Sequence, residues 1–96
     1  MKEKHYENME ESQQIEEILI EREGTYGDFS YNAIVTQGLK AHLRMSKNWD
    51  SMSSPHREAL EMICHKMSRI VNGDSNYKDS WADIQGYAAL AEKECK

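Results

Sequence analysis

Apolar residues recur at helical spacing along most of the chain, and no long stretch alternates apolar and polar positions as a strand does. The spacing predicts helices over residues 12–23, 30–45 and 54–71, and a fourth from about residue 78 to residue 91. Polar loops separate the second, third and fourth helices. The fold class expected is therefore all-α, a small four-helix domain with a C-terminal helical hairpin.

Residues that favour helix ends mark several of the predicted boundaries. Ser12 is a suitable N-cap for the first helix, and Gly24 is a suitable residue to end it. Ser54 followed by Pro55 marks the start of the third helix, because proline fits the first helical turn. Asp79 is a candidate N-cap for the fourth helix.

The third predicted helix carries the clearest apolar stripe, and its members are expected to form the core. They are Leu60, Ile63, Met67, Ile70 and Val71. Gly38, in the middle of the second helix, suggests a close approach of another helix there, because an internal glycine otherwise costs about 1 kcal/mol relative to alanine. Trp49, in the following loop, is expected to fold back over apolar surface.

Composition narrows the class of protein. The 96 residues fit one helical domain, with residues 1–11 expected to form a flexible N-terminal segment because they contain few apolar side chains. The net charge of -5 argues against an extended nucleic-acid surface. No apolar run is long enough for a membrane span, and the polar start does not resemble a signal peptide. Two cysteines form no disulfide framework, which favours the cytoplasm.

The segment GTYGDFSYN, residues 24–32, contains two glycines and three aromatic residues. Two interpretations remain open for it. In the first, Tyr26 and Phe29 fill the core beside a turn, with Asp28 or Ser30 capping the next helix. In the second, the glycine backbone and the aromatic side chains form one wall of a pocket, where an aromatic ring can stack on a base.

Charged side chains lie on or beside the apolar stripes of the C-terminal hairpin. Glu58 and Glu61 form an E-x-x-E pair and lie about 60° apart around their helix. Along an antiparallel hairpin, Glu61 and Asp83 are offset by roughly 9 Å at about 1.5 Å per residue. Asp83 is therefore expected closer to Lys66 and Arg69 than to Glu61.

Two hypotheses follow for these charges. In the first, the acids and bases of the hairpin pair with one another as an ion network. In the second, the acids bind Mg²⁺ and the bases contact phosphates, since Mg²⁺ prefers carboxylates, waters and substrate phosphates as ligands. The candidate metal ligands are Glu58, Glu61, Asp79 and Asp83. The candidate substrate-binding residues are Lys66, Arg69, Lys78, Tyr26 and Phe29.

The segments EREGTYGDF and REALEMICHKMSRIVNGDSNYKDSWADIQGYAAL resemble a family of small phage and prophage proteins of unknown function. The similarity extends over roughly residues 15–90, most of the chain. This resemblance implies a setting in the cytoplasm of a bacterial host cell and no particular reaction.

More distantly, the acids resemble the pattern of the MazG-like all-α nucleoside triphosphate pyrophosphohydrolases, which is E-x-x-E on one helix and E-x-x-D on the next. Glu58, Glu61 and Asp83 match this pattern, whereas Ser80 stands where a Glu is expected and Asp79 lies one position earlier. The resemblance implies Mg²⁺ as cofactor, a (deoxy)nucleoside triphosphate as substrate, and a MazG-like bundle formed on assembly into dimers or tetramers.

Three functions are therefore compatible with the sequence. The first is a phage-encoded, Mg²⁺-dependent pyrophosphohydrolase acting on (d)NTPs. The second is a non-catalytic phage accessory protein that binds a nucleotide or a host protein. The third is a structural oligomer without a small ligand. A homo-oligomer is expected in all three cases, because a 96-residue chain of four helices with two Trp residues has more apolar surface than it can bury alone.

Overall fold

The computed structural model describes residues 10–96, so most of the N-terminal segment predicted to be flexible lies outside the described residues. Within the described part, four α-helices and one 3₁₀ turn are present, and no strand is. Their bounds are Glu11–Tyr26 for α2, Phe29–Arg44 for α3, Ser54–Asn72 for α4, Lys78–Lys93 for α5, and Trp49–Ser51 for the 3₁₀ turn η1. The predicted all-α class is confirmed.

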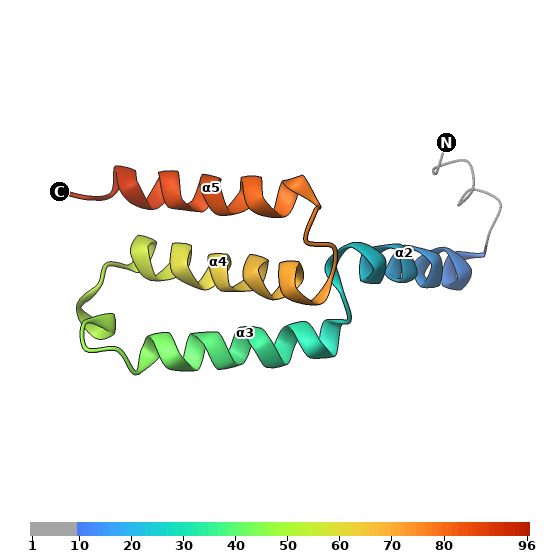
Figure 1. Ribbon diagram of the computed structural model, residues 1–96, viewed down its shortest axis with the longest axis horizontal. Coiled ribbons are helices and arrows are strands. Elements are labelled where there is room, and N and C mark those ends of the chain that lie inside the picture. The colour runs from blue at the N-terminus through green and yellow to red at the C-terminus, as the bar shows by residue number, and fades with distance from the viewer. Residues whose placement is uncertain (1–9) are drawn as a thin grey trace.

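Three of the helices form a single layer. Figure 1 shows α3, α4 and α5 side by side, with α4 in the middle, and α2 projecting beyond one end of the layer. The helices α4 and α5 form the predicted C-terminal hairpin. The molecule is consequently elongated, measuring 52 × 26 × 24 Å along its principal axes.

The helix boundaries differ slightly from those predicted. Helix α2 continues through Gly24 and ends at Tyr26, so the predicted end at Gly24 is wrong. Gly27 has a φ of 86°, a left-handed conformation that favours glycine, and this residue terminates the helix instead. Asp28 caps α3 by accepting a hydrogen bond from the Tyr31 backbone N–H at 3.1 Å, as one of the two predicted caps.

The caps of the hairpin helices also shift. Ser53, one residue earlier than predicted, accepts a hydrogen bond from the backbone N–H of His56 at the start of α4. At the start of α5 the N-cap position belongs to Tyr77, so Asp79 lies in the first turn and not at the cap. Such shifts of one or two residues leave the helices themselves as predicted.

Fewer residues of the apolar stripe of α4 are buried than the sequence predicts. Trp49 is buried, with 7% of its surface exposed, as expected for a residue that folds back over the layer. Ile70 is also buried, but Leu60, Met67 and Val71 are exposed. The physical reason is that α3 and α5 cover only the two flanks of α4, so a third side of this helix faces solvent.

The expected close approach at Gly38 is wrong as well. A Cβ atom at this position would have no neighbour within 4 Å, so Gly38 lies on an open side of α3. Among residues 10–96, no helix combines the length and the apolarity needed to cross a membrane.

Candidate functional site

Two glycine-containing segments cross where α2, α3 and α4 meet. A Cβ atom on Gly27 would collide with the backbone carbonyl of Asn72, and one on Gly73 would collide with the backbone of Thr25. The backbone N–H of Asp74 donates a hydrogen bond to the carbonyl oxygen of Thr25 at 2.8 Å. The GTYGDF loop and the NGD turn therefore form one tight backbone junction, which requires glycine on both sides.

Two asparagines fasten this junction from the side. The Nδ2 atom of Asn72 donates to Oδ1 of Asn32 at 3.0 Å, and Nδ2 of Asn32 donates to the carbonyl oxygen of Tyr26 at 2.7 Å. The first residues of α3, the last residue of α4 and the end of α2 are thus joined by consecutive hydrogen bonds. This arrangement fixes the backbone of Tyr26 relative to α4.

The Tyr26 ring lies close to two arginines. The guanidinium of Arg22, one turn earlier on α2, lies 4.8 Å from the ring centroid, and that of Arg69 on α4 lies 4.7 Å from it. Tyr77 contacts the same ring edge-on, with centroids 5.7 Å apart. Within residues 10–96, neither arginine forms an ion pair with a carboxylate. Both guanidinium groups therefore lie within 4.8 Å of the centre of one ring, in a chain whose net charge is -5.

A pocket of about 490 Å³ opens beside this arginine pair, between α2, α3 and α4. Its lining includes Leu19, Arg22, Phe29, Gln37, His65 and Arg69, together with the acidic residues Glu23 and Asp28. Phe29 is 84% exposed, so it lies at the edge of the pocket and does not fill the core. Of the two interpretations of the aromatic loop, the geometry thus agrees with the one that places it in a pocket wall.

The floor of the pocket contains buried polar groups that are satisfied. The hydroxyl of Thr36 donates to Oγ of Ser68 at 2.8 Å, and the Ser68 hydroxyl donates to the carbonyl oxygen of His65 at 2.8 Å. Burial, followed by the positive charges of Lys40 and Arg69, lowers the pKa of His65 below its ordinary value. His65 therefore presents a neutral imidazole to the pocket at pH 7.

The E-x-x-E pair lies toward the other end of α4. The carboxylate of Glu61 pairs with the guanidinium of Arg44 at 2.7 Å, and a shallower hollow of about 300 Å³ is lined by Glu58, Glu61, Arg44, Arg57 and other residues. Glu61 is thus engaged by a base that sequence reasoning did not consider.

The sequence predicts that the acids of α5 pair with the bases of α4 across the hairpin, and one such ion pair is confirmed. Nζ of Lys66 lies 3.0 Å from Oδ2 of Asp83, whereas Arg69 lies over Tyr26 and not beside an acid. At the start of α5, the carboxylate of Asp79 accepts a hydrogen bond from the Tyr77 hydroxyl at 3.2 Å. The Tyr26 hydroxyl and the Asp79 carboxylate raise the pKa of Tyr77 to about 12.

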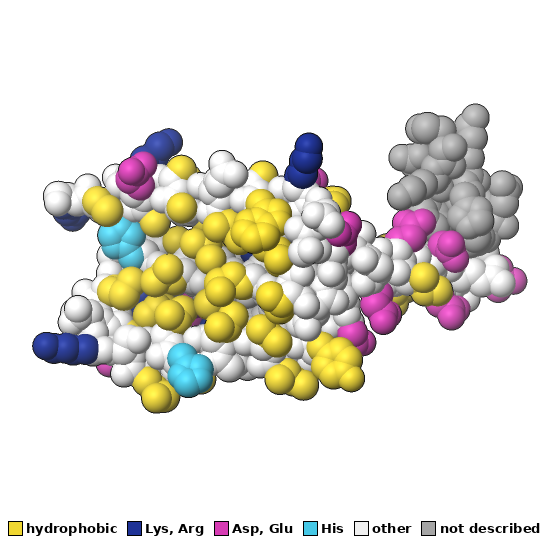
Figure 2. All heavy atoms as spheres, in the orientation of Figure 1, with side chains coloured by type: hydrophobic (Ala, Val, Ile, Leu, Met, Phe, Trp, Pro, Cys, Tyr) yellow, Lys and Arg dark blue, Asp and Glu magenta, His cyan; other side chains and the backbone are white. Residues whose placement is uncertain are grey.

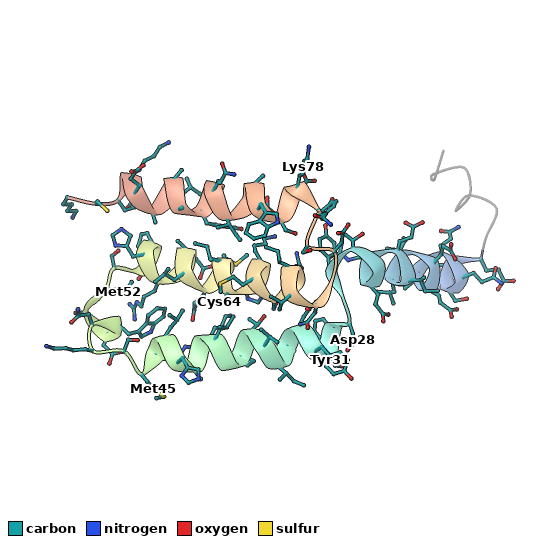
Figure 3. The ribbon with its side chains drawn as sticks, viewed as in Figure 1. Asp28, Tyr31, Met45, Met52, Cys64 and Lys78 are labelled. Atoms are coloured by element: carbon teal, nitrogen blue, oxygen red, sulfur yellow. The ribbon has the colours of Figure 1, made fainter. Side chains whose placement is uncertain are left out.

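Lys78, the remaining predicted phosphate contact, points away from the layer at the start of α5 (Figure 3). It does not line the pocket beside Tyr26. Of the five predicted substrate-binding residues, the structure therefore brings together Tyr26, Phe29 and Arg69, and places Lys66 and Lys78 elsewhere.

The four predicted metal ligands do not converge within one chain. No group of three or more His, Cys, Asp or Glu side chains in residues 10–96 is arranged to hold a metal ion. Glu61 and Asp83 are each paired with a base, and Asp79 is bonded to Tyr77. A Mg²⁺ site built from these four residues thus does not fit a single copy of the chain.

The pattern of a known family covers almost the whole sequence. A domain of unknown function, DUF6378, matches residues 8–95. The chain belongs to the DUF6378 family. No curated protein and no solved structure matches it.

Several residues of the pocket and of the junction beside it escaped sequence reasoning. Arg22 could have been found, because it lies one turn before Tyr26 on the same predicted helix. Asn32, His65 and Asn72 carry no such local signal. Their roles depend on how α3 packs against α4, and no spacing within one helix reports that packing.

Proposed function

We propose that this DUF6378 chain binds a nucleotide in the pocket beside Tyr26 and does not hydrolyse it by itself. The observation that carries the proposal is the pair of arginines, Arg22 and Arg69, held on one ring without a carboxylate partner among residues 10–96. The two guanidinium groups share one ring and one pocket, so their positive charges repel each other, and an anion bound in the pocket offsets that repulsion.

The chemistry of the pocket suits a phosphate joined to a planar ring. Guanidinium groups bind phosphate oxygens through paired, charge-assisted hydrogen bonds. Phe29, exposed at the pocket edge, offers an aromatic face for a base. The neutral imidazole of His65 adds a hydrogen-bonding group that a base or a sugar hydroxyl can use.

Hydrolysis is the further step that the MazG-like resemblance implies. It needs carboxylates that hold Mg²⁺ against the phosphates, and within one copy the acids that match the pattern lie apart from the arginine pocket. Binding is therefore the function that the geometry of this chain favours. The phage setting and the cytoplasmic location remain predictions from sequence.

The test is calorimetric titration of the full chain with a panel of dNTPs and NTPs, with Mg²⁺ and with EDTA. We expect at least one nucleotide to bind, and Arg69→Gln to weaken binding by at least about tenfold, because a charge-assisted phosphate contact contributes about 1.5–3 kcal/mol. Arg57→Gln is the matched control. It removes the same charge from the same helix, at the shallower hollow beside Glu58 and Glu61. The affinity of this variant for the nucleotide should therefore equal that of the wild type.

Three outcomes would contradict the proposal. One is the absence of binding by any nucleotide from well-folded protein. Another is equal weakening by Arg57→Gln and Arg69→Gln, which would indicate general electrostatic attraction. The last is release of pyrophosphate from a dNTP in the presence of Mg²⁺, which would show that the chain is a hydrolase.

A further inference from the structure

The layer of α3, α4 and α5 leaves one side of its central helix without a covering element. Helix α4 contacts α3 through Ser68 and α5 through Lys66, so these two flanks are occupied. Globular domains usually consist of two layers of secondary structure packed around one hydrophobic core. A single layer of helices has no second layer to cover its apolar side. The apolar side chains that are buried within residues 10–96 are Trp49, Ala59, Cys64 and Ile70.

Three large apolar side chains of α4 form a row on the uncovered side. At about 100° per residue, Leu60, Met67 and Val71 lie within about 40° of one another around the helix. All three are exposed. Arg69 points to the opposite side of α4 by the same geometry. The row therefore lies on the opposite side of the layer from the pocket lined by Arg22 and Arg69, which we call the arginine pocket.

Trp81 extends this row onto α5. It is two residues from Asp83, so the two side chains point to nearly opposite sides of their helix. Asp83 reaches Lys66 on the pocket side, which places Trp81 on the same side as the α4 row. Half of its surface is exposed. We call Leu60, Met67, Val71 and Trp81 together the apolar face.

The apolar face carries no charge at its centre. Figure 2 shows hydrophobic side chains gathered over α4 and the adjoining sides of α3 and α5, while the acidic and basic side chains in this view lie around the margins. Two such faces can meet without bringing acids together, although each copy has a net charge of -5. A charged partner of another kind would find no complementary group there.

The exposed area also agrees with the need for a second copy. The chain exposes 7357 Å², whereas a compact globular protein of 11.2 kDa exposes roughly 5,700 Å². The difference is roughly 1,700 Å², whereas a standard interface buries about 800 Å² on each partner. The chain therefore has enough surplus surface for one stable homodimer contact.

We propose that two copies of the chain associate face to face through the apolar face, around a twofold axis, leaving both arginine pockets open on the outside of the dimer. The two α4 helices then cover each other, and the pair forms the two-layer arrangement that one copy lacks. This interface does not depend on whether the pocket binds a nucleotide.

The test compares two substitutions that introduce the same carboxylate at different places, by sedimentation velocity. Val71→Glu places a carboxylate within the apolar face, and Ile34→Glu places one on α3, two residues before Thr36 and thus pointing away from α4. The two parent side chains are 70% and 68% exposed. We expect the wild type and Ile34→Glu to sediment as dimers, and Val71→Glu to dissociate at least about a hundredfold more readily, because buried unpaired charge is costly.

A second measurement avoids substitutions. Trp49 is buried within one copy, so dilution of the wild type should change the tryptophan emission only through Trp81, which moves from an apolar contact into water. A red shift on dilution, at the concentration where sedimentation shows dissociation, supports the interface. A wild-type monomer at micromolar concentration, a Val71→Glu variant as dimeric as the wild type, or emission that does not change during dissociation would each overturn it.

Discussion

At the scale of single residues, Tyr26 organises the pocket because its ring is shared. Arg22, Arg69 and Tyr77 all contact it, and its carbonyl oxygen accepts a hydrogen bond from Asn32. A cation–π contact contributes about 0.5–1 kcal/mol at exposed sites, which orients a guanidinium without neutralising it. Both arginines thus keep their charge and their hydrogen-bond donors available to an anion.

The lowered pKa of His65 predicts how the free energy of unfolding depends on pH. Its pKa in the folded chain lies below the unfolded value of about 6.5, so the unfolded state binds more protons between the two values. The stability from its neutral form is present above pH 6.5 and is lost as the pH falls below it. We expect urea denaturation to show a decline in the free energy of unfolding from pH 7 to pH 5, which His65→Gln reduces.

His42→Gln is the control for this measurement, because His42 is exposed on α3 and should leave the decline unchanged. If His65→Gln retains the full wild-type decline, the neutral, partly buried state of His65 is refuted.

Sequence reasoning identified part of this site. Tyr26, Phe29 and Arg69 were named, since aromatic residues in a glycine loop and a base beside an apolar stripe are visible locally. Arg44 was not considered, although its pairing with Glu61 decides what that acid does. Charges on one helix can be placed by periodicity, but their partners on another helix depend on packing that periodicity does not report.

At the scale of elements, glycines that cannot be told apart in the sequence have different structural roles. Gly27 terminates α2 with a positive φ and touches the Asn72 backbone, whereas Gly38 lies inside α3 with open space around it. Only the former is needed to bring α2 against α4. Helix α2 ends at Tyr26 and not at Gly24 for the same reason, because the turn is made by Gly27, whose backbone lies against Asn72.

The two glycines should respond in opposite directions to alanine. Gly27→Ala is expected to destabilise the fold by at least roughly 1–3 kcal/mol, because a side chain there meets both an unfavourable φ and the Asn72 carbonyl. Gly38→Ala should stabilise it by about 0.5–1 kcal/mol through lower entropy in the unfolded chain. Urea midpoints measure both, and a loss of stability in Gly38→Ala would show that α3 is approached there.

At the scale of the whole molecule, four amphipathic helices do not make a closed bundle. Periodicity correctly gave the number and type of the helices in residues 10–96. It could not give the single layer, since an apolar stripe shows that a helix face needs cover and not which chain supplies it. The stripe residues Leu60, Met67 and Val71 were predicted as core, and in one copy they are exposed.

A dimer built through that stripe makes thermal stability depend on concentration. A tenfold increase in protein concentration should raise the Tm of the wild type by roughly 3–6 °C, because association stabilises only the folded state. The Tm of Val71→Glu should not depend on concentration over the same range. Calorimetry that finds one wild-type Tm at all concentrations would contradict a folded dimer coupled to unfolding.

The backbone junction at Gly27 attaches α2 to the layer at one end only. This helix of 16 residues is about 24 Å long, so most of its length extends beyond the layer (Figure 1). The pocket wall includes Arg22 on α2 and Arg69 on α4. A ligand held by both arginines would therefore connect α2 to the layer at a second point, through side chains, besides the backbone junction.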